Sequence, residues 1–141
     1  MNILLVEDDP VHIKLVERAI KKSGFNNQLT VIKDGEAVFN YLFNQNTEIS
    51  GEEFVYPHLI LLDINLPKIN GLEILRRIKQ SPQLQHIPVV ILTTSSNRTD
   101  LEKCSEYHAN SYVIKPLDYD EFNQKIRSIE YYWLTVNEII Y

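Results

Sequence analysis

Short runs of mostly large aliphatic residues recur along the chain and predict five strands. They cover residues 2–6, 29–32, 59–62, 89–92 and 112–114. The run at 59–62 (LILL) contains four consecutive aliphatic residues, which is typical of a strand buried on both faces of a parallel sheet. Between the runs, apolar residues return every three or four positions, which is the period of an amphipathic helix. The pattern therefore predicts strands and helices in alternation.

Polar residues at the ends of the helical segments support these predicted elements. Asp9 before Pro10 predicts a capped first helix, and Gly24 predicts its end. A second helix is expected after Asp34-Gly35, and two more at about 72–80 and 98–107. Asp118 followed by Glu121 resembles a capping box before the last helix. The residues expected to face the sheet include Ile13, Val16, Ile20, Val38, Tyr41, Leu42, Leu72, Leu75, Ile78, Leu101 and Cys104.

Five strand–helix alternations with short connections predict one α/β domain. Right-handed crossovers place the helices on both faces of a parallel sheet. We expect a flavodoxin-like, doubly wound fold of the (βα)5 type, with five parallel strands in the order 2-1-3-4-5. Residues 44–56 are polar and acidic without periodicity, and they are interpreted as an unusually long surface loop.

Composition narrows the possible functions. The net charge of −5 argues against a nucleic-acid-binding surface. The single cysteine, Cys104, excludes an internal disulfide framework and metal sites built from cysteine pairs. No apolar run has transmembrane length and no signal-peptide pattern precedes the first strand, so we expect a cytoplasmic protein without a membrane partner.

Acidic residues follow two strands that should be neighbours in the sheet. Glu7 and Asp8 come after the first strand and Asp63 comes after the third, at the switch point of the predicted strand order. Carboxylates brought so close repel one another, and a hard divalent cation such as Mg²⁺ relieves that repulsion. Two carboxylates and a backbone carbonyl near Asn65 form a plausible ligand set. The alternative is an acidic loop with a helix cap, which we accept for Asp9.

A hydroxyl and an amine are expected at the same edge of the sheet. Thr93 ends the fourth strand and Lys115 ends the fifth. A cation and a lysine would neutralise the oxygens of an incoming phosphoryl group, while one carboxylate attacks phosphorus. Taken singly, each residue has an ordinary structural explanation. Their occurrence at successive strand ends favours phosphoryl chemistry.

The sequence resembles a known family, the receiver domains of two-component response regulators. The segments VEDDP, LLDINLPKING, PVVILTT and YVIKPL occur in the family's order and at its spacing. The similarity covers roughly residues 1–131. It implies a protein that accepts a phosphoryl group from a sensor histidine kinase and catalyses only its own phosphorylation and dephosphorylation, and is otherwise not an enzyme.

The resemblance also implies roles for individual residues in binding the cation. Asp63 would be the phosphoacceptor and a metal ligand, and Asp8 would bind Mg²⁺ directly, with Mn²⁺ as a possible substitute. Glu7 would act through water, and Asn65 would contribute its backbone carbonyl.

Further roles are implied for binding the phosphate and for switching. Thr93 would be the switch hydroxyl, and Tyr112 the aromatic residue that turns inward with it. Lys115 would bind the phosphate, and the bond between Lys115 and Pro116 is expected to be cis.

A narrower resemblance concerns the partners. The long loop and the aromatic tail resemble stand-alone regulators that pair with cyanobacterial phytochromes, so a phytochrome is an expected kinase. Only residues 132–141 follow the predicted receiver, which leaves no room for an output domain. We therefore expect signalling through a downstream protein or onward phosphotransfer.

Three other functions are compatible with parts of the pattern. An aspartyl phosphohydrolase usually has a second aspartate two residues after the first, where this chain has Asn65. A flavin-binding module would need a loop after the first strand that accepts phosphate, and Glu7 and Asp8 would repel it. A receiver-like module that binds partners without phosphorylation is disfavoured because the acidic pair, Asp63, Thr93 and Lys115 are all present.

The last helix carries a heptad-like apolar seam. Its members are Phe122, Ile126, Ile129, Trp133, Val136 and Ile140. The first three are expected to pack on the sheet, whereas the later ones extend beyond it. Exposed apolar surface of this size usually marks an interaction site, so we expect a homodimer through the last helix. Docking onto the kinase and folding back on the domain are the alternatives.

Overall fold

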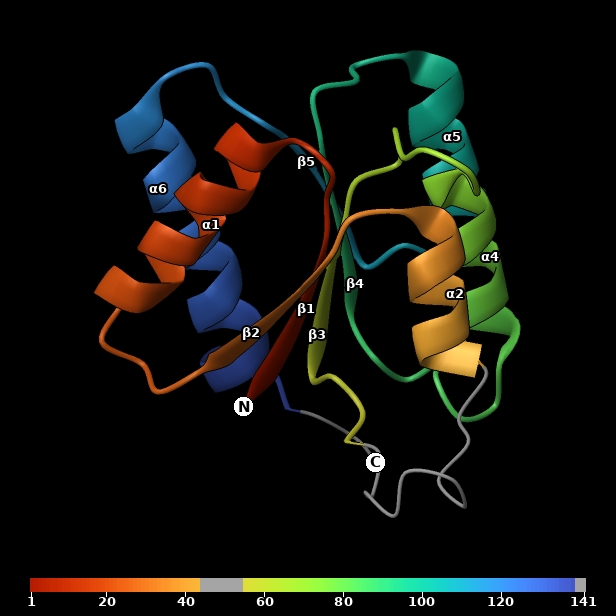
Figure 1. The fold of residues 1–141 in the computed structure, drawn as a ribbon, viewed down its shortest axis with the longest axis horizontal. Coiled ribbons are helices and arrows are strands. Elements are labelled where there is room, and N and C mark those ends of the chain that lie inside the picture. The colour runs from red at the N-terminus through yellow and green to blue at the C-terminus, as the bar shows by residue number, and fades with distance from the viewer. Residues whose placement is uncertain (44–54, 139–141) are drawn as a thin grey trace.

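A central sheet is covered by helices on both faces (Figure 1). The structure is a computed structural model that describes residues 1–43 and 55–138. The strands are β1 (Asn2–Val6), β2 (Gln28–Ile32), β3 (Leu59–Leu62), β4 (Val89–Thr93) and β5 (Ser111–Ile114). The helices are α1 (Pro10–Lys22), α2 (Gly35–Phe43), α4 (Gly71–Gln80), α5 (Arg98–Glu106) and α6 (Tyr119–Tyr131), and a π-helical turn, η1 (Tyr132–Val136), follows α6.

All five strands are parallel, in the order β2-β1-β3-β4-β5. The predicted flavodoxin-like fold and strand order are therefore confirmed. Val6 at the end of β1 pairs with Leu62 at the end of β3. Because both strands run in the same direction, the residues that follow them emerge side by side at one edge of the sheet.

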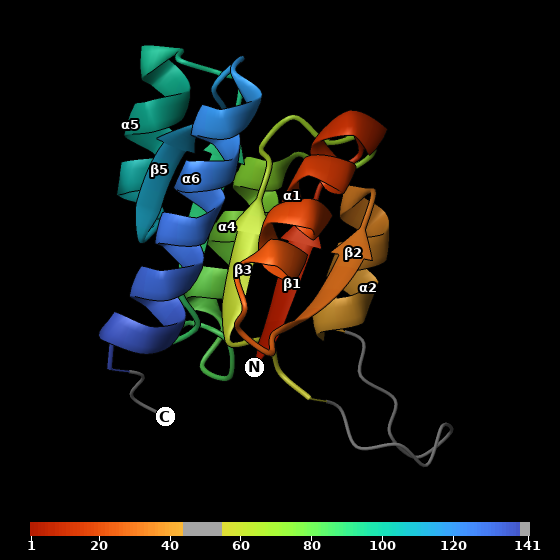
Figure 2. The same cartoon turned by 90° about the vertical axis from the view of Figure 1, so that its left-hand side faces the viewer.

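The two faces of the sheet bury separate apolar clusters. Ile3 and Leu5 pack under α1 and α6, which lie side by side on one face (Figure 2). Leu4 and Val6 point to the opposite face, where α2, α4 and α5 cover them. This alternation follows from the two-residue period of a strand. Burial on both faces explains why β1, β3 and β4 are almost uninterrupted aliphatic runs.

The helix caps are those predicted. A carboxylate oxygen of Asp9 accepts the N–H of Val11 at 2.9 Å, and Asp118 accepts the N–H of Glu121 at 3.1 Å. Gly24 has a φ of 80°, two residues after α1 ends, a backbone conformation that glycine adopts without steric cost. These local contacts fix where α1 and α6 begin and hence where they cross the sheet.

The structure corrects one predicted core residue and qualifies two others. Leu101 is 43% exposed, because α5 is a short polar helix that buries only Cys104. Tyr41 and Leu72 are half-buried against the core. The predicted surface loop lies outside the described residues over 44–54. No helix in the described ranges is long and apolar enough to cross a membrane.

The predicted apolar tail only partly follows its heptad spacing. The N–H of Asn137 donates to the carbonyl of Tyr132 at 2.7 Å, which closes a turn wider than an α-helical one. Asn137 itself is extended, so the helical spacing ends at Val136. Trp133 and Leu134 pack against the cluster under α1 and α6, whereas Val136 is 51% exposed. Ile140 lies outside the described residues.

Candidate functional site

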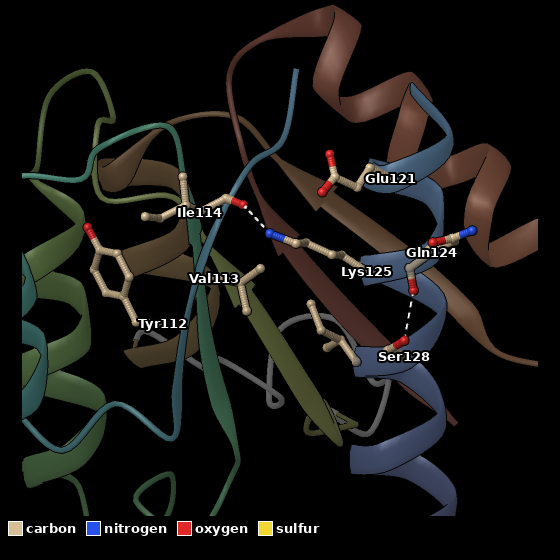
Figure 3. Close-up of a pocket in the computed structure, with 8 residues that line it drawn as sticks. Tyr112, Val113, Ile114, Glu121, Gln124, Lys125 and Ser128 are labelled. Carbon is tan, nitrogen blue, oxygen red and sulfur yellow. Dashed lines mark hydrogen bonds between the residues drawn. The ribbon is translucent and has the colours of Figure 1, made fainter. Parts of the chain in front are cut away.

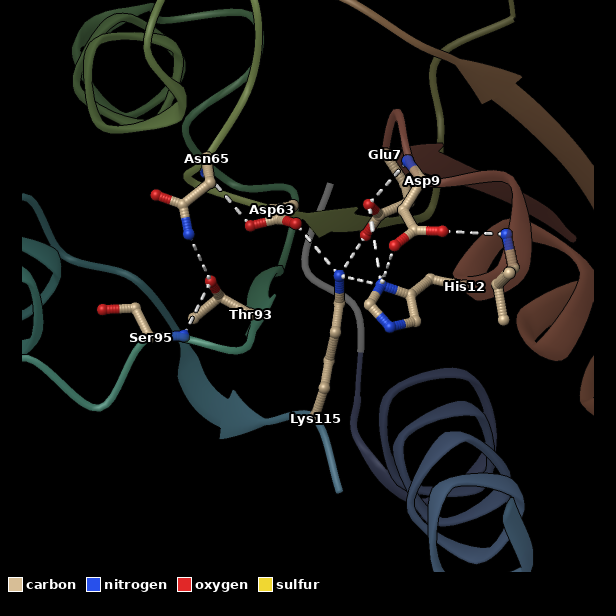
Figure 4. Close-up of polar contacts among 9 residues, drawn as sticks. Glu7, Asp9, His12, Asp63, Asn65, Thr93, Ser95 and Lys115 are labelled. Carbon is tan, nitrogen blue, oxygen red and sulfur yellow. Dashed lines mark hydrogen bonds and ion pairs between the residues drawn. The ribbon is translucent and has the colours of Figure 1, made fainter. Parts of the chain in front are cut away.

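The three predicted carboxylates, Glu7, Asp8 and Asp63, meet at the carboxyl edge of the sheet, and Figure 4 shows Glu7 and Asp63 there. Glu7 follows β1 and is 1% exposed, Asp63 follows β3 and is 6% exposed, and Asp8 is exposed. Each offers one oxygen atom within 4.8 Å of the others. Buried carboxylates at this spacing need compensating positive charge.

Backbone packing holds Asp63 in place. Its N–H donates to the carbonyl of Val6 at 3.0 Å, and its Oδ1 accepts the N–H of Asn65 at 3.0 Å. The start of α4 then presses against it, because a Cβ at Gly71 would lie 2.4 Å from the carbonyl oxygen of Asp63. Only glycine permits this approach, so the loop from β3 to α4 is anchored on both sides of the carboxylate.

Lys115 supplies positive charge from the end of β5. Its Nζ donates to a carboxylate oxygen of Glu7, to Oδ2 of Asp63 at 2.9 Å and to Nδ1 of His12 at 2.9 Å. The lysine side chain is 2% exposed, as is that of Glu7. The prediction that Lys115 lies near Asp63 is met by this geometry.

The predicted cis bond between Lys115 and Pro116 is wrong. Every peptide bond in the described part of the chain is trans. The trans form is the more stable isomer of an X–Pro bond by about 0.5–1 kcal/mol, so it is adopted wherever the fold does not demand cis.

Burial and charge shift two ionisable groups here. Burial raises the pKa of Glu7 to about 7; the hydrogen bond from Lys115 opposes this rise, and the charge of Asp63 adds to it. Burial lowers the pKa of His12, and the adjacent charge of Lys115 lowers it further. The carboxylates together carry more negative charge than one lysine balances. Oxygen-only donors with this surplus suit a hard divalent cation.

Thr93 and Tyr112 are linked through one residue of the loop after β4. The buried Thr93 Oγ1 accepts the N–H of Ser95 at 3.3 Å and the side-chain amide of Asn65 at 3.4 Å. The Tyr112 hydroxyl donates to the carbonyl of Ser95 at 2.8 Å. The backbone of Ser95 is therefore hydrogen-bonded to both Thr93 and Tyr112.

Sequence reasoning missed two residues of this site, His12 and Ser95. His12 lies one turn beyond Asp8 at the start of α1, and a wheel of α1 drawn from its Asp9 cap would have placed it beside the carboxylates. Ser95 contacts Thr93 and Tyr112 through its backbone N–H and carbonyl, so the identity of its side chain could not indicate this position.

Comparison with known proteins identifies the family. Residues 3–127 match the response regulator receiver domain. Response regulator Rcp1 of Synechocystis sp. is 41% identical over 132 residues, which cover 94% of this chain and 88% of Rcp1. The probable methanogenesis regulatory protein FilR2 of Methanothrix harundinacea is 42% identical over 135 residues, covering 96% of this chain and 84% of FilR2.

Solved structures agree with the sequence matches. The Mn²⁺-bound form of Rcp1 superposes with a TM-score of 0.89 at 38% identity, covering 99% of both chains. The phosphorylated cyanobacterial phytochrome response regulator RcpA gives a TM-score of 0.89 at 34% identity, covering 99% of this chain and 98% of RcpA. With its five-stranded parallel sheet and the carboxylates at its edge, the chain therefore belongs to the response regulator receiver family.

Proposed function

We propose that this receiver accepts a phosphoryl group on Asp63, with Mg²⁺ bound beside it, and passes the signal on through protein contacts. One observation carries the proposal. Asp63 is a nearly buried carboxylate beside the acidic pair of Glu7 and Asp8, and a buried lysine, with its Nζ 2.9 Å from Asp63, bridges it to Glu7. This arrangement provides a nucleophile together with groups that neutralise phosphate oxygens.

The proposed step moves a phosphoryl group from a phosphohistidine to Asp63. A carboxylate oxygen of Asp63 attacks phosphorus and forms a P–O bond, while the P–N bond breaks and its electron pair returns to the imidazole. Lys115 then exchanges its contact with Asp63 for a phosphoryl oxygen. The Thr93 hydroxyl donates to another phosphoryl oxygen. Both contacts strengthen as charge builds on the transferred group.

Asp8, Asp63 and the backbone carbonyl of Asn65 would hold the cation, and Glu7 would reach it through water. When bound, Mg²⁺ or Mn²⁺ supplies charge neutralisation for the phosphoryl oxygens. The residues present fit a divalent cation because Glu7, Asp8 and Asp63 each offer a carboxylate oxygen within 4.8 Å of the others. The Mn²⁺-bound form of Rcp1 supports this proposal.

The direct test is phosphorylation of the full chain by acetyl phosphate with Mg²⁺, followed by intact mass spectrometry. One added phosphoryl group per chain is expected, and the adduct should be lost in alkali, as acyl phosphates are. A chain that gains no mass at saturating donor and Mg²⁺ would contradict the proposed function.

A sensor histidine kinase is the proposed phosphodonor, and a phytochrome is the proposed form of that kinase. The support is the similarity to RcpA, a phytochrome response regulator. The receiver itself would extend over residues 1–131, followed by the apolar segment 132–141.

The surface between β5 and α6 is the proposed output face. It contains a hollow of about 680 Å³ (Figure 3). Its lining residues are Tyr112, Val113, Ile114, Glu121, Gln124, Lys125, Ser128 and Ile129. Lys125 bridges the hollow by donating to the carbonyl of Ile114 at 3.2 Å. Since Tyr112 both lines the hollow and bonds to the loop after β4, a change at Thr93 would reshape this face.

Thr93→Ala should uncouple phosphorylation from this change. The variant should take up phosphate within about threefold of the wild-type rate, because a single neutral hydrogen bond contributes only modestly. The phosphoryl group could then make no hydrogen bond with a hydroxyl at position 93. Because a ligand shifts an equilibrium only through contacts that differ between the two states, the conformational change should be lost. Amide NMR shifts of Ser95 and Tyr112 on phosphorylation should therefore be small. The exposed neighbour provides the control, since Thr94→Ala should show the full change; a full change in Thr93→Ala would remove its hydroxyl from the switch.

We propose a homodimer through the end of the last helix. Tyr131, Tyr132 and Val136 are each about half exposed there, and Phe25 adds a ring 6.1 Å from that of Tyr131. This apolar surface remains although Trp133 and Leu134 fold back on the domain.

The double substitution Tyr132→Lys and Val136→Lys should convert this dimer to a monomer. Both side chains are exposed, so the domain should stay folded, while charges opposed across a two-fold axis repel. Analytical ultracentrifugation at high micromolar concentration measures the change. Leu101→Lys on α5 is a matched control with similar exposure, and it should remain dimeric. A monomeric wild-type chain under these conditions would rule out the dimer.

A further inference from the structure

His12 is held against the phosphorylation site by contacts from three elements. Its ring stacks on that of the buried Phe122 of α6, with centroids 6.0 Å apart and planes 18° from parallel. Its Nδ1 lies 2.9 Å from Nζ of Lys115 and 3.5 Å from a carboxylate oxygen of Asp9. The side chain is 23% exposed, so packing rather than solvent fixes the ring (Figure 4).

The hydrogen bonds of Lys115 determine the state of this imidazole. A lysine ammonium has three N–H donors and no acceptor. Here the donors go to Glu7, Asp63 and His12, one to each. Nδ1 of His12 must therefore accept, which places the imidazole proton on Nε2. All three N–H groups of the Lys115 ammonium therefore donate hydrogen bonds, two to carboxylates and one to a neutral nitrogen.

We propose that His12 is a positioning residue for Lys115: its neutral Nδ1 fixes the ammonium beside Asp63 so that it meets an incoming phosphoryl oxygen without rearranging. The inference rests on the proposed phosphorylation of Asp63 and extends it. When Lys115 gives up its contact with Asp63, the bonds to Glu7 and His12 keep Nζ at the same place. A flexible four-carbon side chain would otherwise have to be ordered during the reaction.

A neutral acceptor suits this position better than another carboxylate. Phosphorylation adds negative charge beside Glu7 and Asp8, and a further anion at position 12 would repel the phosphoryl group at short range. A neutral nitrogen directs the ammonium without adding that repulsion. The stack on Phe122 helps to hold the ring in this orientation.

Three substitutions at this position separate hydrogen bonding from packing. His12→Phe keeps a ring against Phe122 but removes the acceptor. His12→Asn puts an amide oxygen close to where Nδ1 lies, whereas His12→Gln carries its oxygen farther out, toward the position of Nε2. The first-order rate of phosphorylation is measured at saturating acetyl phosphate and Mg²⁺. We expect His12→Phe and His12→Gln to be about tenfold slower than wild type, and His12→Asn to remain within about threefold.

A second readout needs no phosphodonor. The Lys115 ammonium is observed by ¹H–¹⁵N NMR of the lysine side chains and assigned from its loss in Lys115→Gln. Its protons should be protected from exchange with water in wild type and His12→Asn, and should exchange at least about tenfold faster in His12→Phe, which lacks one of the three bonds.

The outcomes distinguish this inference from the proposed function. Wild-type rates and protection in His12→Phe would overturn the role of His12. Slow phosphorylation in both His12→Asn and His12→Gln, with the wild-type rate in His12→Phe, would assign the effect to ring packing and would also overturn it. If the wild-type chain accepts no phosphate, the proposed function fails, yet protection of the ammonium still decides whether His12 positions Lys115.

Discussion

Asp63→Asn should abolish uptake of the phosphoryl group from acetyl phosphate, so that intact mass spectrometry finds only unmodified chain. An amide is a far weaker nucleophile than a carboxylate, and the added mass should disappear rather than move to another acid. The fold should persist, because the amide oxygen still accepts from one of the two donors, Lys115 or the N–H of Asn65, and Lys115 keeps its hydrogen bonds to Glu7 and His12. Removing one of three neighbouring charges also reduces repulsion with Glu7.

The matched control for this experiment is Asp34→Asn. Asp34 caps the start of α2 by accepting the N–H of Ala37 at 2.7 Å, and asparagine caps equally well. This variant should gain phosphate at the wild-type rate. A phosphorylated Asp63→Asn chain would show that another side chain is the acceptor.

Asp8→Asn should lose at least about tenfold in affinity for divalent cations, because it replaces a charged oxygen ligand of a hard ion with a neutral one. Mn²⁺ titration followed by the electron paramagnetic resonance signal of the free ion measures this loss. Phosphorylation should slow in parallel, and a chelator should suppress it in the wild-type chain. Asp8 is exposed, so the thermal unfolding temperature without metal should change little.

Asp9→Asn tests whether Asp8 binds the cation directly or whether loss of any negative charge nearby lowers Mn²⁺ affinity. Asp9 lies next to Asp8 but uses its carboxylate to cap α1, and asparagine retains that cap. Mn²⁺ affinity in this variant should stay within about threefold of wild type, reflecting only the lost long-range charge. Equal losses in Asp8→Asn and Asp9→Asn would mean that Asp8 is not a direct ligand.

The sequence alone predicted the strands, the helix starts and the residues that end each strand. These features depend on local chemistry: aliphatic runs such as LILL form buried strands, and residues such as Asp9 and Asp118 cap helices wherever they occur. Parallel strands bring their carboxyl ends to one edge, so Glu7, Asp63, Thr93 and Lys115 could be placed together before the structure was known.

Only the tertiary structure decided which atoms meet at that edge and where the last α-helix ends. Lys115 contacts His12 across 103 positions of sequence, and Tyr112 reaches the Ser95 backbone from another strand. Such contacts depend on how α1, α6 and the sheet pack, which no local pattern encodes. The same packing folds Trp133 onto the domain, whereas its seam neighbour Val136 stays half exposed, because a wide π-helical turn rotates the chain beyond Tyr131.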